Sequence, residues 1–141
     1  MVKLASLGKW LFALPMAVFG SLHFGPLEFS LPYVPDWLTW PAFWVYLAGA
    51  GLLLFTLSAI LKRFDRLAAI LLGVELLLFV ILIHLPKAFS GDFLGIIATF
   101  RDIAMAGAAW MFASRFAYDR RLNITEAGPQ VNDQFQGDAF H

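Results

Sequence analysis

The sequence predicts an all-α integral membrane protein, folded as a four-helix bundle with both termini in the cytoplasm. Of its 141 residues, 60% are hydrophobic and only 14% are charged, whereas soluble domains are about half apolar and about a quarter charged. Four apolar segments are each close to the roughly 20 residues that a helix needs to cross a bilayer. Lys and Arg gather at the N-terminus, in the second connection and after the last segment, which is the pattern of cytoplasmic loops.

The chain is expected to form one membrane domain over residues 1–121. Pro15 lies inside the first segment and removes a backbone donor, a loss that a helix bundle can compensate. Residues 122–141 are polar, and we expect them to form a disordered cytoplasmic tail. The membrane helices are expected at residues 7–24, 42–61, 67–85 and 93–118.

The connections between the segments set the expected orientation. The second connection is short and carries Lys62, Arg63 and Arg66, so it should face the cytoplasm. The first connection, residues 25–41, is rich in proline and aromatic residues and holds two acidic residues but no Lys or Arg. It should therefore face outward and cap the bundle, with the third connection beside it.

Composition also excludes several kinds of chemistry. The chain has no cysteine, which excludes disulfide exchange and thiolate ligation of a metal. The formal net charge is zero, so no basic surface points to nucleic acid. The three histidines and ten acidic residues show no spacing typical of a metal site, and no metal ligand is assigned.

Polar residues from three helices are expected at one depth. A rise of about 1.5 Å per residue puts His23, His84 and Asp102 each about 27 to 30 Å from basic residues at the cytoplasmic side. The hydrocarbon core is about 30 Å thick, so all three should reach the outer interface, together with Arg101. Polar side chains at such a depth are costly, and this cluster is therefore the candidate catalytic site.

Glu75 is expected at a different level, near the middle of the bilayer. It lies nine residues before His84, which is about 13 Å deeper. Nine residues are two and a half helical turns, so the two side chains should point to opposite sides of an ideal helix. The buried carboxyl should face the bundle interior and bond to Ser21, Thr56 or Ser58 on neighbouring helices.

Each of these features also has a purely structural interpretation. A histidine at a helix end can lie half in water at the interface, and Arg101 next to Asp102 can be an ion pair whose arginine extends outward. Glu75 can supply a bond that fixes helix packing. Small residues allow close helix contacts in membranes, and such contacts are expected at four glycines: Gly49, Gly51, Gly73 and Gly107.

Short motifs in a particular order resemble a known family. The first segment ends with Phe19, Gly20, His23 and Phe24. The later motifs are Val34-Pro35-Asp36-Trp37-Leu38, Trp44-Val45-Tyr46-Leu47-Ala48-Gly49, His84-Leu85-Pro86 and Arg101-Asp102-Ile103-Ala104-Met105-Ala106-Gly107. Over residues 7–116, the chain resembles the DoxX-like family of small four-helix membrane proteins. The resemblance implies a bacterial inner-membrane protein linked to a redox or quinone-dependent process, but it supplies no list of catalytic residues.

The first functional hypothesis is a quinone-linked redox subunit with its polar site at the outer, periplasmic face. Imidazole titrates near neutrality and can bond a quinone head group or carry protons, a role expected for His23 and His84. Asp102 would orient a histidine, and Arg101 would stabilise a developing anion. Further head-group contacts are expected from the outer aromatic belt, at Trp44 and Tyr46.

Three other functions stay open. The chain carries no flavin or nicotinamide motif, so a redox role needs a protein partner. The main alternative is a non-enzymatic accessory or assembly subunit of a larger membrane complex or homo-oligomer. A haem held by His23 and His84 is disfavoured, because most such pairs bind none. A carrier for a small lipophilic molecule has little support, because broken-helix pairs are lacking.

Overall fold

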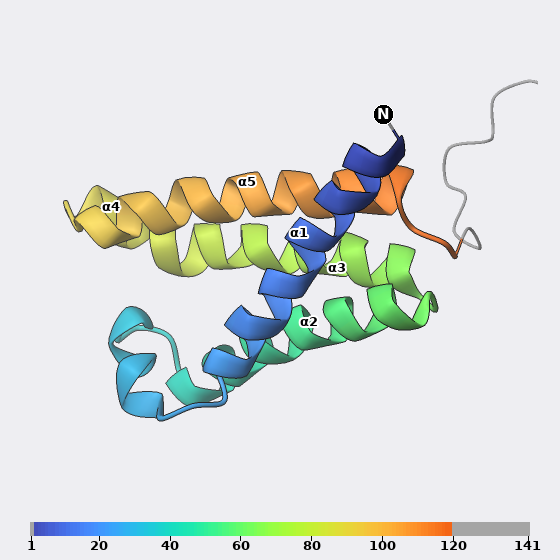
Figure 1. Cartoon of the computed structure of the whole chain (residues 1–141). Helices are drawn as coiled ribbons and strands as arrows, with labels where there is room; N and C mark the ends of the chain where they lie inside the picture. Colours follow the sequence, from blue (N-terminus) through green and yellow to red (C-terminus); the bar gives the residue numbers. More distant parts are fainter. Residues whose placement is uncertain (1, 120–141) are drawn as a thin grey trace, which may run out of the picture.

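The computed structural model describes residues 2–119, and every element of regular secondary structure in that range is helical (Figure 1). The predicted tail at residues 122–141 lies outside the described residues. Two short 3-10 helices follow the first helix, and a π-helical turn (η3) continues α3. The elements in order are α1 Val2–Leu22, η1 Leu27–Phe29, η2 Leu31–Tyr33, α2 Pro41–Leu61, α3 Asp65–Phe79, η3 Val80–His84, α4 Leu85–Phe89 and α5 Phe93–Arg115.

Three helical stretches are long and apolar enough to cross a membrane. They are α2, the continuous stretch Asp65–Phe89, and α5. A fourth span arises if α1 is taken together with η1 and η2, although these bend away from it by 110°. The predicted all-helical class is confirmed, and the three to four candidate spans are compatible with the predicted membrane location.

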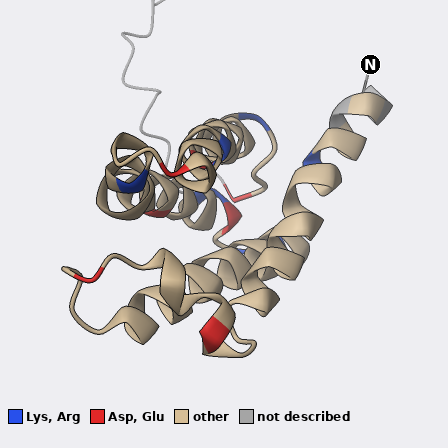
Figure 2. Cartoon of the chain, turned by 90° about the vertical axis from the view of Figure 1, so that its left-hand side faces the viewer, with Lys and Arg blue, Asp and Glu red and all other residues tan. Residues whose placement is uncertain are grey.

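Helices that are neighbours in the chain are also neighbours in space. α1 packs along α2, α2 along α3, and α3 along α5. Figure 2 shows that α1 leans away from the remaining helices toward its N-terminus. The connection between α1 and α2 and the turn between α4 and α5 lie at one end of the molecule, called here the loop end (left in Figure 1).

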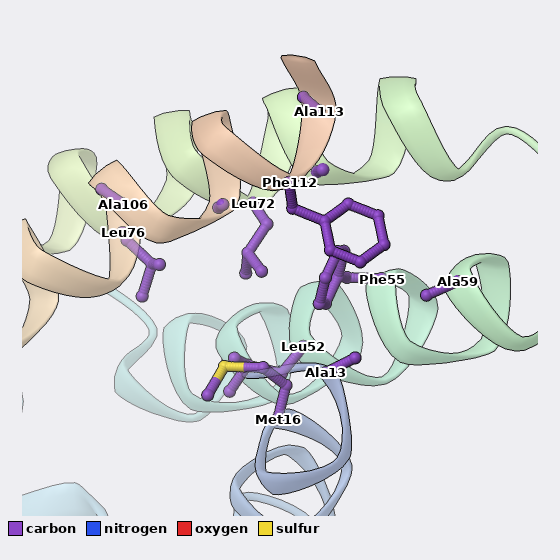
Figure 3. Close-up of a cluster of buried hydrophobic side chains, with 12 residues drawn as sticks. Ala13, Met16, Leu52, Phe55, Ala59, Leu72, Leu76, Ala106, Phe112 and Ala113 are labelled. Atoms are coloured by element: carbon purple, nitrogen blue, oxygen red, sulfur yellow. The ribbon is translucent and has the colours of Figure 1, made fainter. Parts of the chain in front are cut away.

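Two phenylalanines occupy the centre of the core. Phe55 of α2 and Phe112 of α5 meet edge to face, with ring centroids 5.1 Å apart. The buried residues around them come from all four long helices (Figure 3). The hydroxyl of Thr56 donates to the carbonyl oxygens of Ala13 at 3.0 Å and of Leu52 at 3.1 Å, so it ties α1 to α2 inside this core.

Glycines let α1 and α2 cross closely. A Cβ on Gly49 would lie 2.7 Å from the Cβ of His23 and 3.0 Å from the carbonyl oxygen of Gly20, so no larger residue fits without moving the helices. Gly51 and Gly73 likewise lie against side chains of neighbouring helices. Gly107 has no such contact within the described chain, because no atom of a neighbouring element in residues 2–119 lies within 4 Å of the place of a Cβ.

The third membrane helix runs past its predicted end at residue 85. An α-helix at this point would place the Pro86 ring against the carbonyl group four residues earlier. Instead, the backbone N–H of Leu85 bonds to the carbonyl oxygen of Val80, the five-residue spacing of a π turn. Because this wider turn precedes the proline, the helix continues to Phe89, and His84 lies within the span.

A buried carboxylate ends the last helix earlier than predicted. Asp65, in the first turn of α3, is fully buried and accepts the backbone N–H groups of Tyr118 at 2.6 Å and Asp119 at 2.9 Å. These bonds draw the chain toward α3. α5 therefore ends at Arg115, three residues before the predicted boundary at residue 118.

Candidate functional site

A cavity of about 380 Å³ lies at the loop end of the molecule. Its walls come from α1, α2, α3 with η3, and α5, and the connection between α1 and α2 contributes further residues. Most of the lining is apolar, including Leu76, Phe79 and Ile83. The charged and titratable side chains among the lining residues include His23, Glu75, His84, Lys87, Arg101 and Asp102.

Three of the predicted site residues form one cluster on the wall of this cavity. The Nε2 atom of His84 lies 3.1 Å from Oδ2 of Asp102, and Nε of Arg101 donates to Oδ1 of the same carboxylate at 2.7 Å. Asp102 is buried, whereas the Arg101 side chain is 50% exposed. We call this arrangement the His84–Asp102–Arg101 cluster.

The helices hold the members of the cluster in different ways. Asp102 is on the buried side of α5, and its carboxylate is within reach of His84 on η3. Arg101 directly precedes Asp102 in α5, and its guanidinium bonds to the carboxylate while the side chain stays half exposed. The cluster therefore joins α5 to η3 through a buried anion with two donor groups around it.

His23 lies on another wall of the same cavity. It follows the last residue of α1, and its Nδ1 atom is 2.7 Å from the carbonyl oxygen of Phe19. No interaction joins His23 to the His84–Asp102–Arg101 cluster within residues 2–119. The structure thus brings the four predicted residues to one cavity, with three in contact and His23 apart.

The two predicted aromatic contacts have different positions. Trp44 lines the cavity, and its indole N–H donates to the carbonyl oxygen of Thr39 at 3.0 Å. Tyr46 is not among the lining residues and instead stacks on Phe24, with ring centroids 5.5 Å apart. We therefore retain Trp44 as a candidate contact and remove Tyr46 from the site.

Glu75 lines the same cavity as His84, in contrast to the expectation that they point to opposite sides. The π turn between them contains one extra residue. The nine residues from Glu75 to His84 therefore rotate the side chains around the helix axis by as much as eight residues would in an α-helix. The angle between the two side chains falls from about 180° to about 80°. The predicted bonds from Thr56 and Ser21 are also wrong, because their hydroxyls donate to backbone carbonyls.

Lys87 is a site residue that sequence reasoning assigned merely to a connection. It lies on α4, because that helix continues past Pro86, and it lines the cavity. Its Nζ atom donates to the carbonyl oxygen of Pro32 at 2.6 Å and lies 5.5 Å from the ring centroid of Tyr33. Lys87 thereby fastens η2 over the cavity.

Within residues 2–119, no group of three His, Asp or Glu side chains could hold a metal ion. No model of a known protein family matches the chain, and no curated protein or solved structure matches it. Fold and site together define an all-helical protein with three to four candidate membrane spans and a polar cluster facing an apolar cavity.

Proposed function

We propose that this chain binds the head group of a quinone or quinol in the cavity at the loop end, as the membrane subunit of a quinone-linked redox assembly. The observation that carries the proposal is the His84–Asp102–Arg101 cluster on the wall of a largely apolar cavity. A lipophilic ring with polar oxygens needs this combination of surfaces.

The size of the cavity supports a ring as the occupant. Pockets for small ligands measure about 300 to 1,000 Å³, and a volume of about 380 Å³ suits a head group but not a long isoprenoid tail. We expect the tail to leave the cavity between Phe19 of α1 and Ile97 of α5, because both residues line the cavity and both side chains are exposed. These two helices do not pack extensively on each other.

The cluster supplies the polar chemistry of the proposed site. The Asp102 carboxylate fixes the orientation of the imidazole, so that His84 can exchange a proton with a ligand oxygen at its other nitrogen or after a small rotation. The half-exposed guanidinium of Arg101 stabilises negative charge next to the cavity. A bound quinone supplies two-electron redox chemistry, and the protein residues hold it and move protons.

The assembly and its place in the cell are part of the same proposal. The resemblance to the DoxX-like family supports a bacterial inner membrane and a redox partner protein. The basic residues of the connection at the opposite end, Lys62, Arg63 and Arg66, support a loop end in the periplasm. Exposed apolar residues on the outer sides of α2 and α5, such as Leu54 and Phe100, are suited to lipid, to that partner or to a second copy of the chain.

Ligand binding by the purified protein in lipid nanodiscs tests the proposal. We expect decyl-ubiquinone or decyl-ubiquinol to quench tryptophan fluorescence saturably, and Trp44→Phe to reduce the amplitude. His84→Ala should weaken binding at least tenfold, whereas the control His141→Ala, outside the described residues, should not. If the wild-type protein binds neither redox form of a ubiquinone or menaquinone analogue, the proposal is wrong.

A second candidate is a non-enzymatic accessory or assembly subunit, favoured by one observation. Both oxygens of Asp102 already have partners within the chain, so the cluster can serve to join α5 to η3. In that case His84→Gln, which keeps a hydrogen-bonding side chain but loses the imidazole, should leave the assembly of the membrane complex unchanged. Quinone binding by the wild-type protein would then be absent.

A further inference from the structure

The deeper polar group of the cavity, Glu75, is a half-buried carboxyl group with an oxygen that the described residues leave without a hydrogen bond. Its Oε1 atom is shielded from solvent and has no hydrogen-bond partner among the described residues. Buried carboxyl groups are costly in a membrane and normally have a partner or a task. The hydroxyl of Thr56, a predicted partner of Glu75, donates instead to the backbone carbonyl oxygens of Ala13 and Leu52.

The chain also makes room for this carboxyl group. The place of a Cβ on Gly51 of α2 is filled by the carboxyl of Glu75, so any larger residue at position 51 would push it away. The absence of a side chain at Gly51 therefore sets the position of Glu75 against α2, on the lining of the cavity.

The π turn aligns Glu75 with His84 along the cavity. With η3 between them, ideal helix geometry puts the two residues about 12 Å apart along the axis and about 80° apart around it. Both side chains line the cavity. A six-membered ring that carries an oxygen at each of two opposite edges, together with one hydrogen bond of about 2.8 Å at each oxygen, spans a length of the same order as this axial separation.

We infer that Glu75 is the inner hydrogen-bonding contact of a two-ended site, in which a ring with hydroxyl groups on opposite edges lies between Glu75 and His84. The inference rests on the proposed function and makes it more specific. A quinol has a hydroxyl that can donate to the Glu75 carboxylate on the cavity lining, whereas a quinone has only acceptor oxygens. The site should therefore bind the reduced form of the ligand more tightly than the oxidised form.

Binding of decyl-ubiquinol and decyl-ubiquinone to the full chain in nanodiscs, under anaerobic conditions, tests the inference. We expect the quinol to bind the wild-type protein at least tenfold more tightly than the quinone. Glu75→Leu should weaken quinol binding at least tenfold, and Glu75→Gln, which keeps an acceptor oxygen, should weaken it less. Gly51→Ala, which displaces the carboxyl group without removing it, should also weaken binding.

Two further measurements separate a binding contact from a structural one. Glu28→Leu removes an acidic residue of η1 that is not among the lining residues, and it should leave both affinities unchanged. Quinol binding should shift the carboxylate stretching bands in the infrared difference spectrum, and this shift should be missing in Glu75→Gln. Circular dichroism and gel filtration confirm that each variant is folded.

The outcomes distinguish the inference from the proposed function. If the wild-type protein binds neither redox form, the proposed function fails and the inference falls with it. If the wild-type protein binds but folded Glu75→Leu binds equally well, the inference alone is wrong. It is also wrong if the quinone binds as tightly as the quinol.

Discussion

The carboxylate of Asp65 accepts the backbone N–H of Tyr118 at 2.6 Å, and this bond joins the first turn of α3 to the chain that follows α5. The second oxygen of the same carboxylate accepts the N–H of Asp119. Asp65 is fully buried, so both bonds are partly shielded from water. One side chain therefore fixes the ends of two helices at the side of the molecule opposite the loop end.

Replacing this carboxylate should destabilise the protein. Bonds to a charged group contribute about 1.5 to 3 kcal/mol each, and because Asp65 accepts two of them, we expect Asp65→Ala to lower the free energy of unfolding by about 3 to 6 kcal/mol. Unfolding in mixed micelles with increasing SDS measures the change. Asp36→Ala, in the exposed part of the connection between α1 and α2, is the control and should have little effect. Equal stability of both variants would show that the bonds contribute nothing.

The His84–Asp102 contact should appear as a coupling energy. We expect a double-mutant cycle with His84→Ala and Asp102→Ala to give a coupling of about 1 to 2 kcal/mol, within the range for residues in direct contact. The same cycle with His23→Ala in place of His84→Ala serves as the control, because no interaction joins His23 to the cluster within the described residues. A coupling of zero for His84 would contradict the geometry.

A side chain at Gly49 should separate α1 from α2. A Cβ there would lie 2.7 Å from atoms of both His23 and Phe24, and overpacking of this kind costs about 1 to 3 kcal/mol. Gly49→Ala should be destabilised by this amount in the same unfolding assay. Gly107→Ala is a matched control on α5, because its Cβ would meet no neighbour, and it should be neutral or slightly stabilising.

Removing the Lys87 ammonium should loosen the connection over the cavity. In Lys87→Met, the bond to the carbonyl oxygen of Pro32 and the contact with the Tyr33 ring are lost. We expect faster hydrogen–deuterium exchange at the amides of Tyr33 and Val34, which bond within η2 and its cap. Arg63→Met, at the far end of the helices, should leave this exchange unchanged. An unchanged rate in Lys87→Met would show that other contacts hold the connection.

Much of the candidate site follows from counting residues along helices. The counts placed His84 and Asp102 at one depth because helix rise is nearly constant, and the structure has them 3.1 Å apart. Counting could not show that His23 lies apart from the cluster, since depth does not fix the rotation of α1. It also could not exclude Tyr46, whose ring turns to Phe24.

The sequence pattern could not predict how Glu75 is rotated around the helix axis relative to His84. An ideal helix puts Glu75 opposite His84, whereas the π turn at Val80–His84 brings them to one cavity. The one local signal for this turn is Pro86, because a proline inside a helix clashes with the preceding turn unless that turn widens. Lys87 was not predicted as a site residue for a related reason, since the helix was expected to end before it.

The sequence by itself determined the all-helical class and the number of long apolar segments, because the length of an apolar run and its flanking charges are local properties of the chain. Tertiary structure decided which polar groups share a cavity, where α5 ends and how closely α1 crosses α2. These depend on helix rotation, on contacts such as Asp65 with Tyr118, and on side-chain volume at positions such as Gly49. Such properties arise when segments far apart in the chain pack together, and no single segment contains them.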